Sequence, residues 1–135
     1  MNTNKIFIEQ VSPFDVATTV EKLVAIAIDK EWQNPATHNL QQSLAKAGKE
    51  VKPVQVIEIC KPKFSGVMLE KNHERIVSVM MPCRISVYEK DDGKAYVALM
   101  NMEAMAAELP ANVAEAMRGA SEESLEIVKS VVGDF

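Results

Sequence analysis

The sequence has 135 residues, of which 47% are hydrophobic and 25% are charged, a composition typical of one soluble globular domain. We therefore expect residues 1–135 to form a single domain. The formal net charge of -4 provides no basic surface for nucleic acid or anionic lipid. No apolar run approaches the roughly 20 residues of a membrane-spanning helix, and residues 1–10 lack the pattern of a secretory signal. These features predict a cytoplasmic protein that binds neither nucleic acid nor membrane.

The first half of the chain predicts two strands and two helices. Ser12 is a suitable helix cap, and Pro13 suits the first helical position. Apolar residues then recur at helical spacing, so the first helix should pack on a sheet. Asn39 is expected to cap the second helix, which leaves His38 just outside its start. The expected elements are a strand over 5–11, a helix over 13–30, a connector over 31–37, a helix over 40–47 and a strand over 54–60.

The second half predicts a β-hairpin followed by helices. The dipeptide Asp92-Gly93 supplies the positive φ that a tight turn requires. If these two residues form the whole loop, Val87 faces Ala98 and Ile85 faces Met100. The expected elements are a helix over 63–71, a strand over 75–81, hairpin strands over 83–90 and 94–100, a helix over 102–109, and a helix over 111–132 interrupted near 119–121.

The order of these elements favours an α+β fold. A strong hairpin among other short strands indicates a mostly antiparallel sheet, and the amphipathic helices must bury their apolar stripes against it. We therefore predict a two-layer α+β sandwich, in which a mostly antiparallel sheet is covered by helices.

Cys60 and Cys83 are the two cysteines of the chain, one at the end of an expected strand and one at the start of another. If those strands are antiparallel neighbours, both thiols lie at the same edge of the sheet, each beside a proline. Their spacing matches no redox or zinc-ribbon motif. The alternatives are two packed core cysteines, which are common in a reducing compartment, and a ligand, metal or redox site.

His38 is the candidate that would complete such a site. A histidine before a helix N-terminus is favoured in its neutral form, which leaves a nitrogen free to bind metal or accept a proton. With Cys60, Cys83 and Glu58 it would form a mixed sulfur, nitrogen and oxygen site that suits zinc or iron. His73 lies in a polar segment and is expected to be solvated.

Methionines are concentrated in the second half of the chain. Thioether side chains form soft, adaptable surfaces, so part of this group could line an apolar cleft or a subunit contact, whereas core filling explains the rest. The group consists of Met80, Met81, Met100, Met102, Met105 and Met117. No nucleophile elbow, phosphate-binding loop, dinucleotide fingerprint or metalloprotease motif is present, and no motif identifies a cofactor.

Four segments in order resemble the domain of unknown function 302 family. They are SPFDVATTVEKL (12–23), His38-Asn39-Leu40, VIEICKP (56–62) and MPCRISVYEKDDGKAYVALMN (81–101). The resemblance implies a compact α+β domain, usually standing alone in bacteria and archaea, that self-associates and has no established activity. It also implies that His38, Cys60 and Cys83 occupy characteristic positions of one branch, whereas other members carry small or aliphatic residues in place of the cysteines.

Three hypotheses follow for the function. In the first, a small binding domain uses His38, Cys60 and Cys83, with Glu58 as a further candidate, to hold a metal ion, a metal cofactor or a sulfur species. In the second, the chain is a homo-oligomeric interaction module without catalytic activity, and the cysteines are only packed. In the third, Cys83 is an enzymatic nucleophile activated by His38, which requires the two side chains to lie within hydrogen-bond reach.

Overall fold

The computed structural model describes residues 2–133, and its centre is a six-stranded antiparallel sheet with the strand order β1-β2-β6-β5-β4-β3. The strands are β1 (Asn2–Thr3), β2 (Phe7–Ser12), β3 (Thr37–Asn39), β4 (Val54–Ile59), β5 (Cys83–Glu89) and β6 (Ala95–Met100). The helices are α1 (Val16–Asp29), α2 (Leu40–Lys46), α3 (Pro62–Met68), the 3-10 helix η1 (Asn72–Met80), α4 (Met102–Ala106) and α5 (Ala111–Val132).

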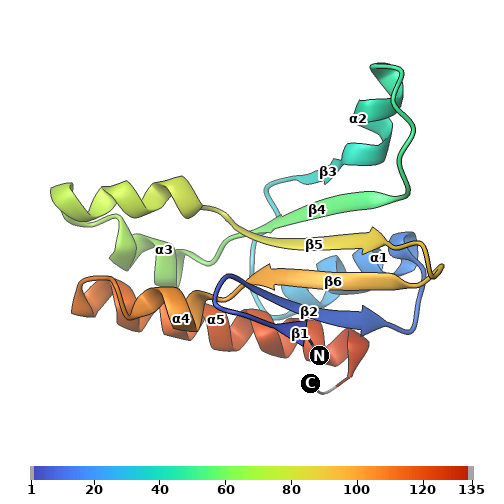
Figure 1. Ribbon diagram of the computed structural model, residues 1–135. Helices are drawn as coiled ribbons and strands as arrows, with labels where there is room; N and C mark the ends of the chain where they lie inside the picture. The colour runs from blue at the N-terminus through green and yellow to red at the C-terminus, as the bar shows by residue number, and fades with distance from the viewer. Residues whose placement is uncertain (1, 134–135) are drawn as a thin grey trace.

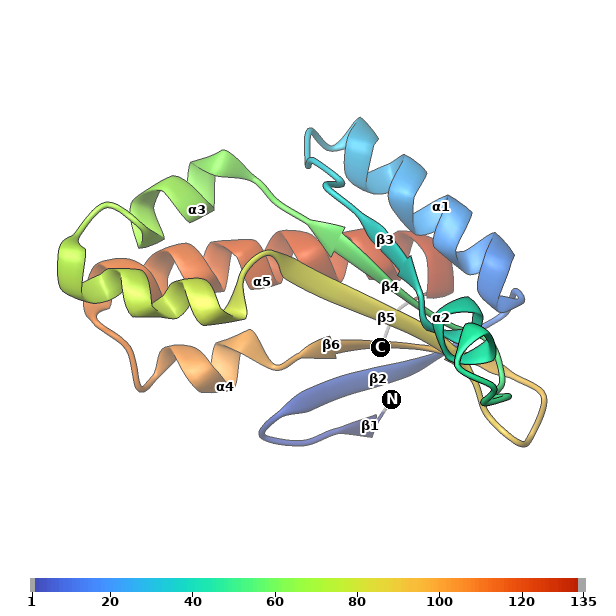
Figure 2. The same ribbon diagram turned by 90° about the horizontal axis from the view of Figure 1, so that it is seen from above.

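Helices α1 and α5 cover one face of the sheet, and the opposite face carries no helix of the described chain (Figures 1 and 2). Apolar residues alternate with more polar ones along the strands, and every second side chain points toward the helices. This pattern explains why only one face is covered. Ile57, Ile85 and Val97 are each at most 1% exposed on that inner face. The predicted α+β sandwich with an antiparallel sheet is confirmed.

Beyond one end of the sheet, α3, η1 and α4 form a second group of helices, here called the helical extension (Figure 1). Helices α3 and α4 both pack against α5, and η1 packs against α3. With 22 residues, α5 is about 33 Å long, so one helix backs both the sheet and the extension. The junction between these two parts is where the sulfur-containing side chains meet.

The hairpin forms, but its predicted register is wrong by one residue on β6. Val87 pairs with Val97 and Ile85 with Leu99, because the loop contains three residues, Asp91 to Gly93. The amide of Lys90 donates to the carbonyl of Lys94, and Gly93 closes the turn at φ +79°. Such a loop is a turn followed by a left-handed glycine. The extra residue turns Ala98 and Met100 to the open face.

The strand predicted over 75–81 is also wrong, since these residues lie in or directly after η1. The apolar and β-branched composition suggested a strand, yet burial follows a three-residue period: Glu74 and Val77 are buried, whereas Ile76 and Val79 are exposed. Packing on the neighbouring helices therefore overrides the local β-propensity.

Two predicted helix boundaries differ as well. Asp15, rather than Ser12, caps α1 by accepting a hydrogen bond from the amide of Thr18 at 2.8 Å, and Ser12 instead ends β2. The expected break near 119–121 is absent, because α5 is continuous and Gly119 lies directly beneath the ring of Phe64. Asn39 does cap α2, as predicted. Within residues 2–133, no helix has both the length and the apolar character needed to cross a membrane.

Candidate functional site

Cys60 and Cys83 lie close together at the end of the sheet that adjoins the helical extension. Cys83 begins β5 opposite Ile59, the last residue of β4, and Cys60 follows directly. Both cysteines line one small cavity, together with the first turn of α3. The Sγ of Cys60 is 3.6 Å from the hydroxyl of Ser65 on that turn. The two thiols are free and partly buried.

Burial changes the acidity of Cys83. Removal from water raises the pKa of its thiol to about 11, and the nearby Cys60 adds to the effect. A thiol with this pKa is protonated at neutral pH, so it is a weak nucleophile. A metal ion binding there would have to displace its proton.

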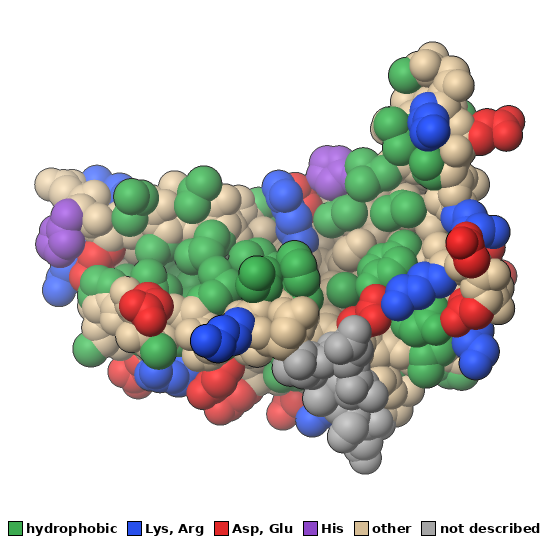
Figure 3. Space-filling view, in the orientation of Figure 1, with side chains coloured by type: hydrophobic (Ala, Val, Ile, Leu, Met, Phe, Trp, Pro, Cys, Tyr) green, Lys and Arg blue, Asp and Glu red, His purple; other side chains and the backbone are tan. Residues whose placement is uncertain are grey.

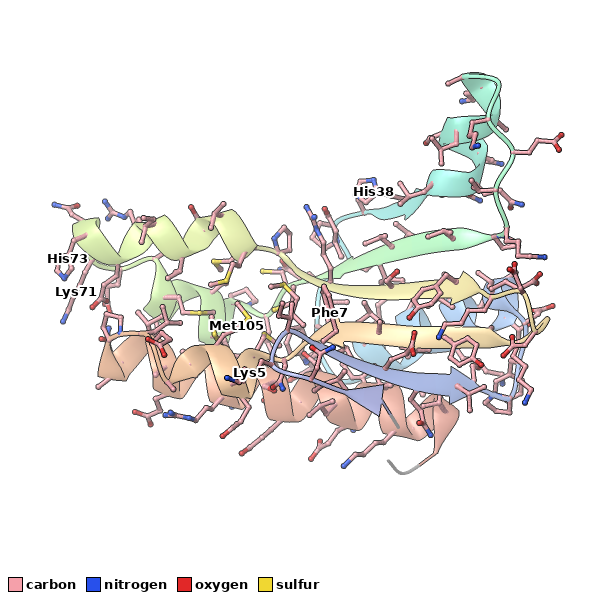
Figure 4. All side chains as sticks on the ribbon, in the orientation of Figure 1. Lys5, Phe7, His38, Lys71, His73 and Met105 are labelled. Atoms are coloured by element: carbon pink, nitrogen blue, oxygen red, sulfur yellow. The ribbon has the colours of Figure 1, made fainter. Side chains whose placement is uncertain are left out.

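His38 and Glu58 form a separate pair on the open face of the sheet. The Nε2 atom of His38, on β3, lies 3.1 Å from the carboxylate of Glu58, on β4. The guanidinium of Arg84, on β5, approaches the same carboxylate to 3.9 Å. Figure 4 shows His38 on β3, far from the tip of the extension where the exposed His73 lies.

The four predicted site residues are therefore found as two pairs, Cys60 with Cys83 and His38 with Glu58. In residues 2–133, no group of three or more His, Cys, Asp and Glu side chains is arranged to hold a metal ion. No hydrogen bond joins His38 to either thiol in this part of the chain. The contact required by the nucleophile hypothesis is not present.

A larger cavity opens beside Cys83, between the sheet and the helical extension. It has a volume of about 160 Å³ and is here called the sulfur cavity. Figure 4 shows sulfur atoms gathered around it, with Met105 of α4 among them. Its sulfur-bearing residues are Met68, Met80, Met81, Cys83, Met100, Met102, Met105 and Met117.

Every methionine within residues 2–133 lines this cavity. The residues come from α3, η1, β6, α4, α5 and the segment between η1 and β5, so the fold concentrates them from distant parts of the sequence. The other lining residues are Val77, Val79, Pro82, Arg84 and Ala120. No carboxylate or imidazole belongs to this lining. The cavity therefore offers thioethers and one thiol as its donors.

The sequence indicated six of these methionines as a group, but it did not reveal that they line one cavity. Met68 was missed because it stands alone in a predicted helix, and nothing in its local pattern distinguishes it from a core residue. Arg84 was missed because a single arginine on a strand is ordinarily a solvated side chain. Only the pairing of β5 with β4 and β6 brings it to the junction.

One solved structure with the same fold is the "Crystal structure of uncharacterized conserved protein DUF302 from Bacillus stearothermophilus". It superimposes with a TM-score of 0.82 at 14% sequence identity, and the match covers 93% of this chain and 97% of that chain. At this identity the similarity shows the fold alone. None of the curated proteins compared with the chain gives a match.

A family model described as "Domain of unknown function DUF302" matches residues 8–129. This range contains all four segments on which the sequence resemblance rests, and it includes both cysteine positions, His38 and Glu58. Because the match covers most of the chain and the solved structure shares the fold, the protein belongs to the DUF302 family.

Proposed function

We propose that the protein is a cytoplasmic binding domain whose sulfur cavity takes a soft metal ion, with Cu(I) as the representative species. The observation that carries the proposal is the convergence of all described methionines and Cys83 on one cavity. Core filling alone would distribute methionines over the whole interior. Here the sheet side of the core, around Leu23, Ile57 and Val97, contains none.

The donor set decides which ions fit. Thioether and thiolate sulfur select soft ions such as Cu(I), whereas Ca²⁺ and Mg²⁺ require several oxygen ligands. The sulfur cavity contains no carboxylate, and its one charged lining residue is Arg84, which repels cations. A singly charged ion held by neutral thioethers and one thiolate suits these surroundings better than a divalent ion. A reducing cytoplasm would keep the thiol of Cys83 available.

The test is an anaerobic Cu(I) titration against a chromophoric chelator. Met105→Leu removes one thioether while nearly conserving volume, and Cys83→Ala removes the thiol. We expect each change to weaken Cu(I) binding, by about tenfold or more for Cys83→Ala. His38→Ala is the matched control, because His38 lies outside the sulfur cavity, and it should leave the affinity unchanged. Equal Cu(I) affinity in the wild type, Cys83→Ala and Met105→Leu would refute the proposal.

The same titration, repeated with zinc and with the other candidate ligands, distinguishes the proposal from the alternatives that the sequence suggested. If His38→Ala lowers the Cu(I) affinity, the result would favour the first hypothesis from the sequence, in which His38, Cys60 and Cys83 bind the metal together. Zinc binding in place of Cu(I) would favour a mixed nitrogen and sulfur site, since zinc accepts imidazole and carboxylate ligands readily. Tight binding of a metal cofactor or a sulfur species, without Cu(I) binding, would also count against a soft-ion site.

A second candidate function is self-association through η1. Ile76 and Val79 are 77% and 84% exposed, and their three-residue spacing places them on one side of a 3-10 helix. Apolar side chains with this exposure favour contact with a second copy of the chain. Light scattering should show an oligomer that Ile76→Ser with Val79→Ser dissociates. Ile28→Ser, at another exposed apolar position on α1, should not dissociate it, and a monomeric wild type would exclude this function.

A further inference from the structure

The open face of the sheet contains a trough that runs across the strands. Its floor is a row of short side chains: Ala98 of β6 pairs with Ser86 of β5, and Ser86 pairs with Val56 of β4. Residues directly opposite one another in a sheet point to the same side. The helices cover the other face, so this row points toward the open face of the sheet, which is the face turned toward the reader in Figure 3.

Large side chains rise on both sides of this floor. Phe7 and Met100 pair with each other on one side, and Phe7 is 51% exposed. Tyr88 stands on the other side and donates a hydrogen bond from its hydroxyl to the carboxylate of Glu9. The cavity between these walls measures about 470 Å³, which is in the size range of small-molecule sites. Figure 4 shows Phe7 beside the end of β6 on this face.

The two charged groups of the trough differ in how far they are neutralised. Glu9 accepts hydrogen bonds from Tyr88 and from Lys90, the latter at 3.0 Å. Arg84 is 62% exposed along its side chain and contacts Glu58 at 3.9 Å. That one long contact leaves most of the five guanidinium N–H groups available. The trough therefore has a satisfied carboxylate next to Ala98 and an available cation on β5, two residues before Ser86.

Ser86 adds a polar group to the middle of the floor. Within residues 2–133 its hydroxyl makes no hydrogen bond, although it lines the cavity. A hydroxyl can donate to or accept from a ligand held above it. Besides Glu9 and Tyr88, which are hydrogen-bonded to each other, the polar side chains of the site are Arg84, Ser86 and Asn4. They are set in an apolar lining that includes Phe7, Val56 and Met100.

We infer that this trough binds a small carboxylate with a flat, apolar body. The carboxylate pairs with Arg84, for which a two-point contact is the favoured geometry. The apolar body lies over Ala98 between Phe7 and Tyr88, where aromatic surfaces can stack against it. A neutral ligand would leave the Arg84 donors unused, and a cationic ligand would be repelled by them.

This inference goes beyond the proposed metal site and does not depend on it. The two cavities adjoin, since Arg84 and Met100 line both, but they offer different chemistry. The sulfur cavity presents soft donors, whereas the trough presents a cation, a hydroxyl and aromatic surfaces. Loss of one activity with retention of the other is therefore measurable.

The test follows binding of benzoate, phenylacetate and indole-3-acetate by two-dimensional NMR of the full chain. For ligands of this size we expect a Kd of about millimolar, with shifts concentrated on β5 and β6. Arg84→Gln should weaken binding about tenfold or more, because it removes a charge-assisted contact. Arg118→Gln is the matched control, since Arg118 lies on α5 and outside the trough, and it should bind as the wild type does.

Ala98→Leu provides a second variant that leaves the charges unchanged. A larger side chain on the floor should block the body of the ligand and abolish the shifts, while Cu(I) binding by the sulfur cavity persists. The inference is overturned if none of the three acids binds, if indole-3-acetamide binds as tightly as indole-3-acetate, or if Arg84→Gln binds normally. It is also overturned if the trough resonances shift with protein concentration alone, because a second copy then covers this face.

Discussion

Cys83 has a partly buried thiol, and removal from water raises its pKa from the ordinary value of 9.0 to about 11. Between these values the unfolded chain loses the thiol proton and the folded chain retains it. A rise in pH through this interval therefore favours unfolding, by about 1.4 kcal/mol for each pH unit. The stabilisation from the protonated thiol is fully present below pH 9.0.

This effect is measurable by denaturant unfolding at pH 8 and pH 10. The wild type should lose about 1 kcal/mol more free energy of unfolding over this range than Cys83→Ala, which has no thiol to titrate. Comparing the two chains removes the contribution of lysines and tyrosines that titrate at similar pH. Identical pH dependence in both chains would show that Cys83 is not in an apolar environment.

Gly119 and Gly66 are both helical glycines, but their surroundings predict opposite effects of alanine. A Cβ atom on Gly119 would lie 2.6 Å from the Cε1 atom of Phe64, whereas Gly66 has nothing within 4 Å. Alanine normally stabilises a helix interior by up to about 1 kcal/mol relative to glycine. Overpacking of a core costs about 1–3 kcal/mol.

We therefore expect Gly66→Ala to raise the thermal midpoint and Gly119→Ala to lower it. Adding Phe64→Leu to Gly119→Ala should recover part of the loss, because the smaller side chain makes room for the new methyl group. A stabilising Gly119→Ala in the wild-type background would mean that the ring of Phe64 does not approach α5 closely.

At the scale of elements, η1 is attached to α5 by a partly buried hydrogen bond. The side-chain amide of Asn112 donates to the carboxylate of Glu74 at 2.8 Å, and Glu74 is 5% exposed. Removing the donor would leave a buried carboxylate short of a partner, which costs about 1–3 kcal/mol.

Asn112→Ala should therefore lower the free energy of unfolding by about that amount. Ser130→Ala, on the exposed side of the same helix, is the control and should change it by less than about 0.5 kcal/mol. Hydrogen exchange measured in parallel should accelerate in η1 before it accelerates in the sheet. An unchanged stability of Asn112→Ala would mean that Glu74 is not held as the structure places it.

The same scale shows what the sequence could and could not predict. Helical periodicity predicted α1, a β-prone run with apolar residues on both faces predicted β4, and the Asp92-Gly93 turn between two β-prone runs predicted β5 and β6. Such patterns failed for η1, where packing on α3 overrides β-propensity, and for the hairpin register, where Asp92-Gly93 suited both a two-residue and a three-residue loop. A loop that is longer by one residue shifts the pairing of β6 with β5 by one residue. Each β6 side chain then points to the opposite face from the one predicted, which changes the residues that line the open face.

The candidate site was harder to predict for a related reason. The closeness of Cys60 and Cys83 followed from placing two strand ends at one sheet edge, and the structure bears this out. The separation of His38 did not follow, because the sequence did not predict the short strand β3, whose pairing with β4 places His38 opposite Val56. Six methionines stood out by number, but only the three-dimensional packing of the helical extension gives them a common cavity.

At the scale of the whole molecule, the sheet and the helical extension meet along α5, and both proposed ligands lie near that junction. The sulfur cavity is formed by residues from both parts, so an ion bound there would link them. Ligand binding of this kind stabilises the folded state in proportion to the logarithm of ligand concentration. The trough, in contrast, lies on the sheet and its flanking loop, and it needs no residue of α3 or η1.

The most direct measurement is X-ray absorption spectroscopy of the protein loaded anaerobically with one equivalent of Cu(I). Because the lining of the sulfur cavity contains thioethers and one thiol but no imidazole or carboxylate, the spectrum should contain sulfur as the only neighbouring scatterer. The Cys83→Ala variant should lose one sulfur neighbour. A spectrum dominated by nitrogen or oxygen neighbours, or one unchanged by Cys83→Ala, would contradict the assignment of the sulfur cavity as the metal site.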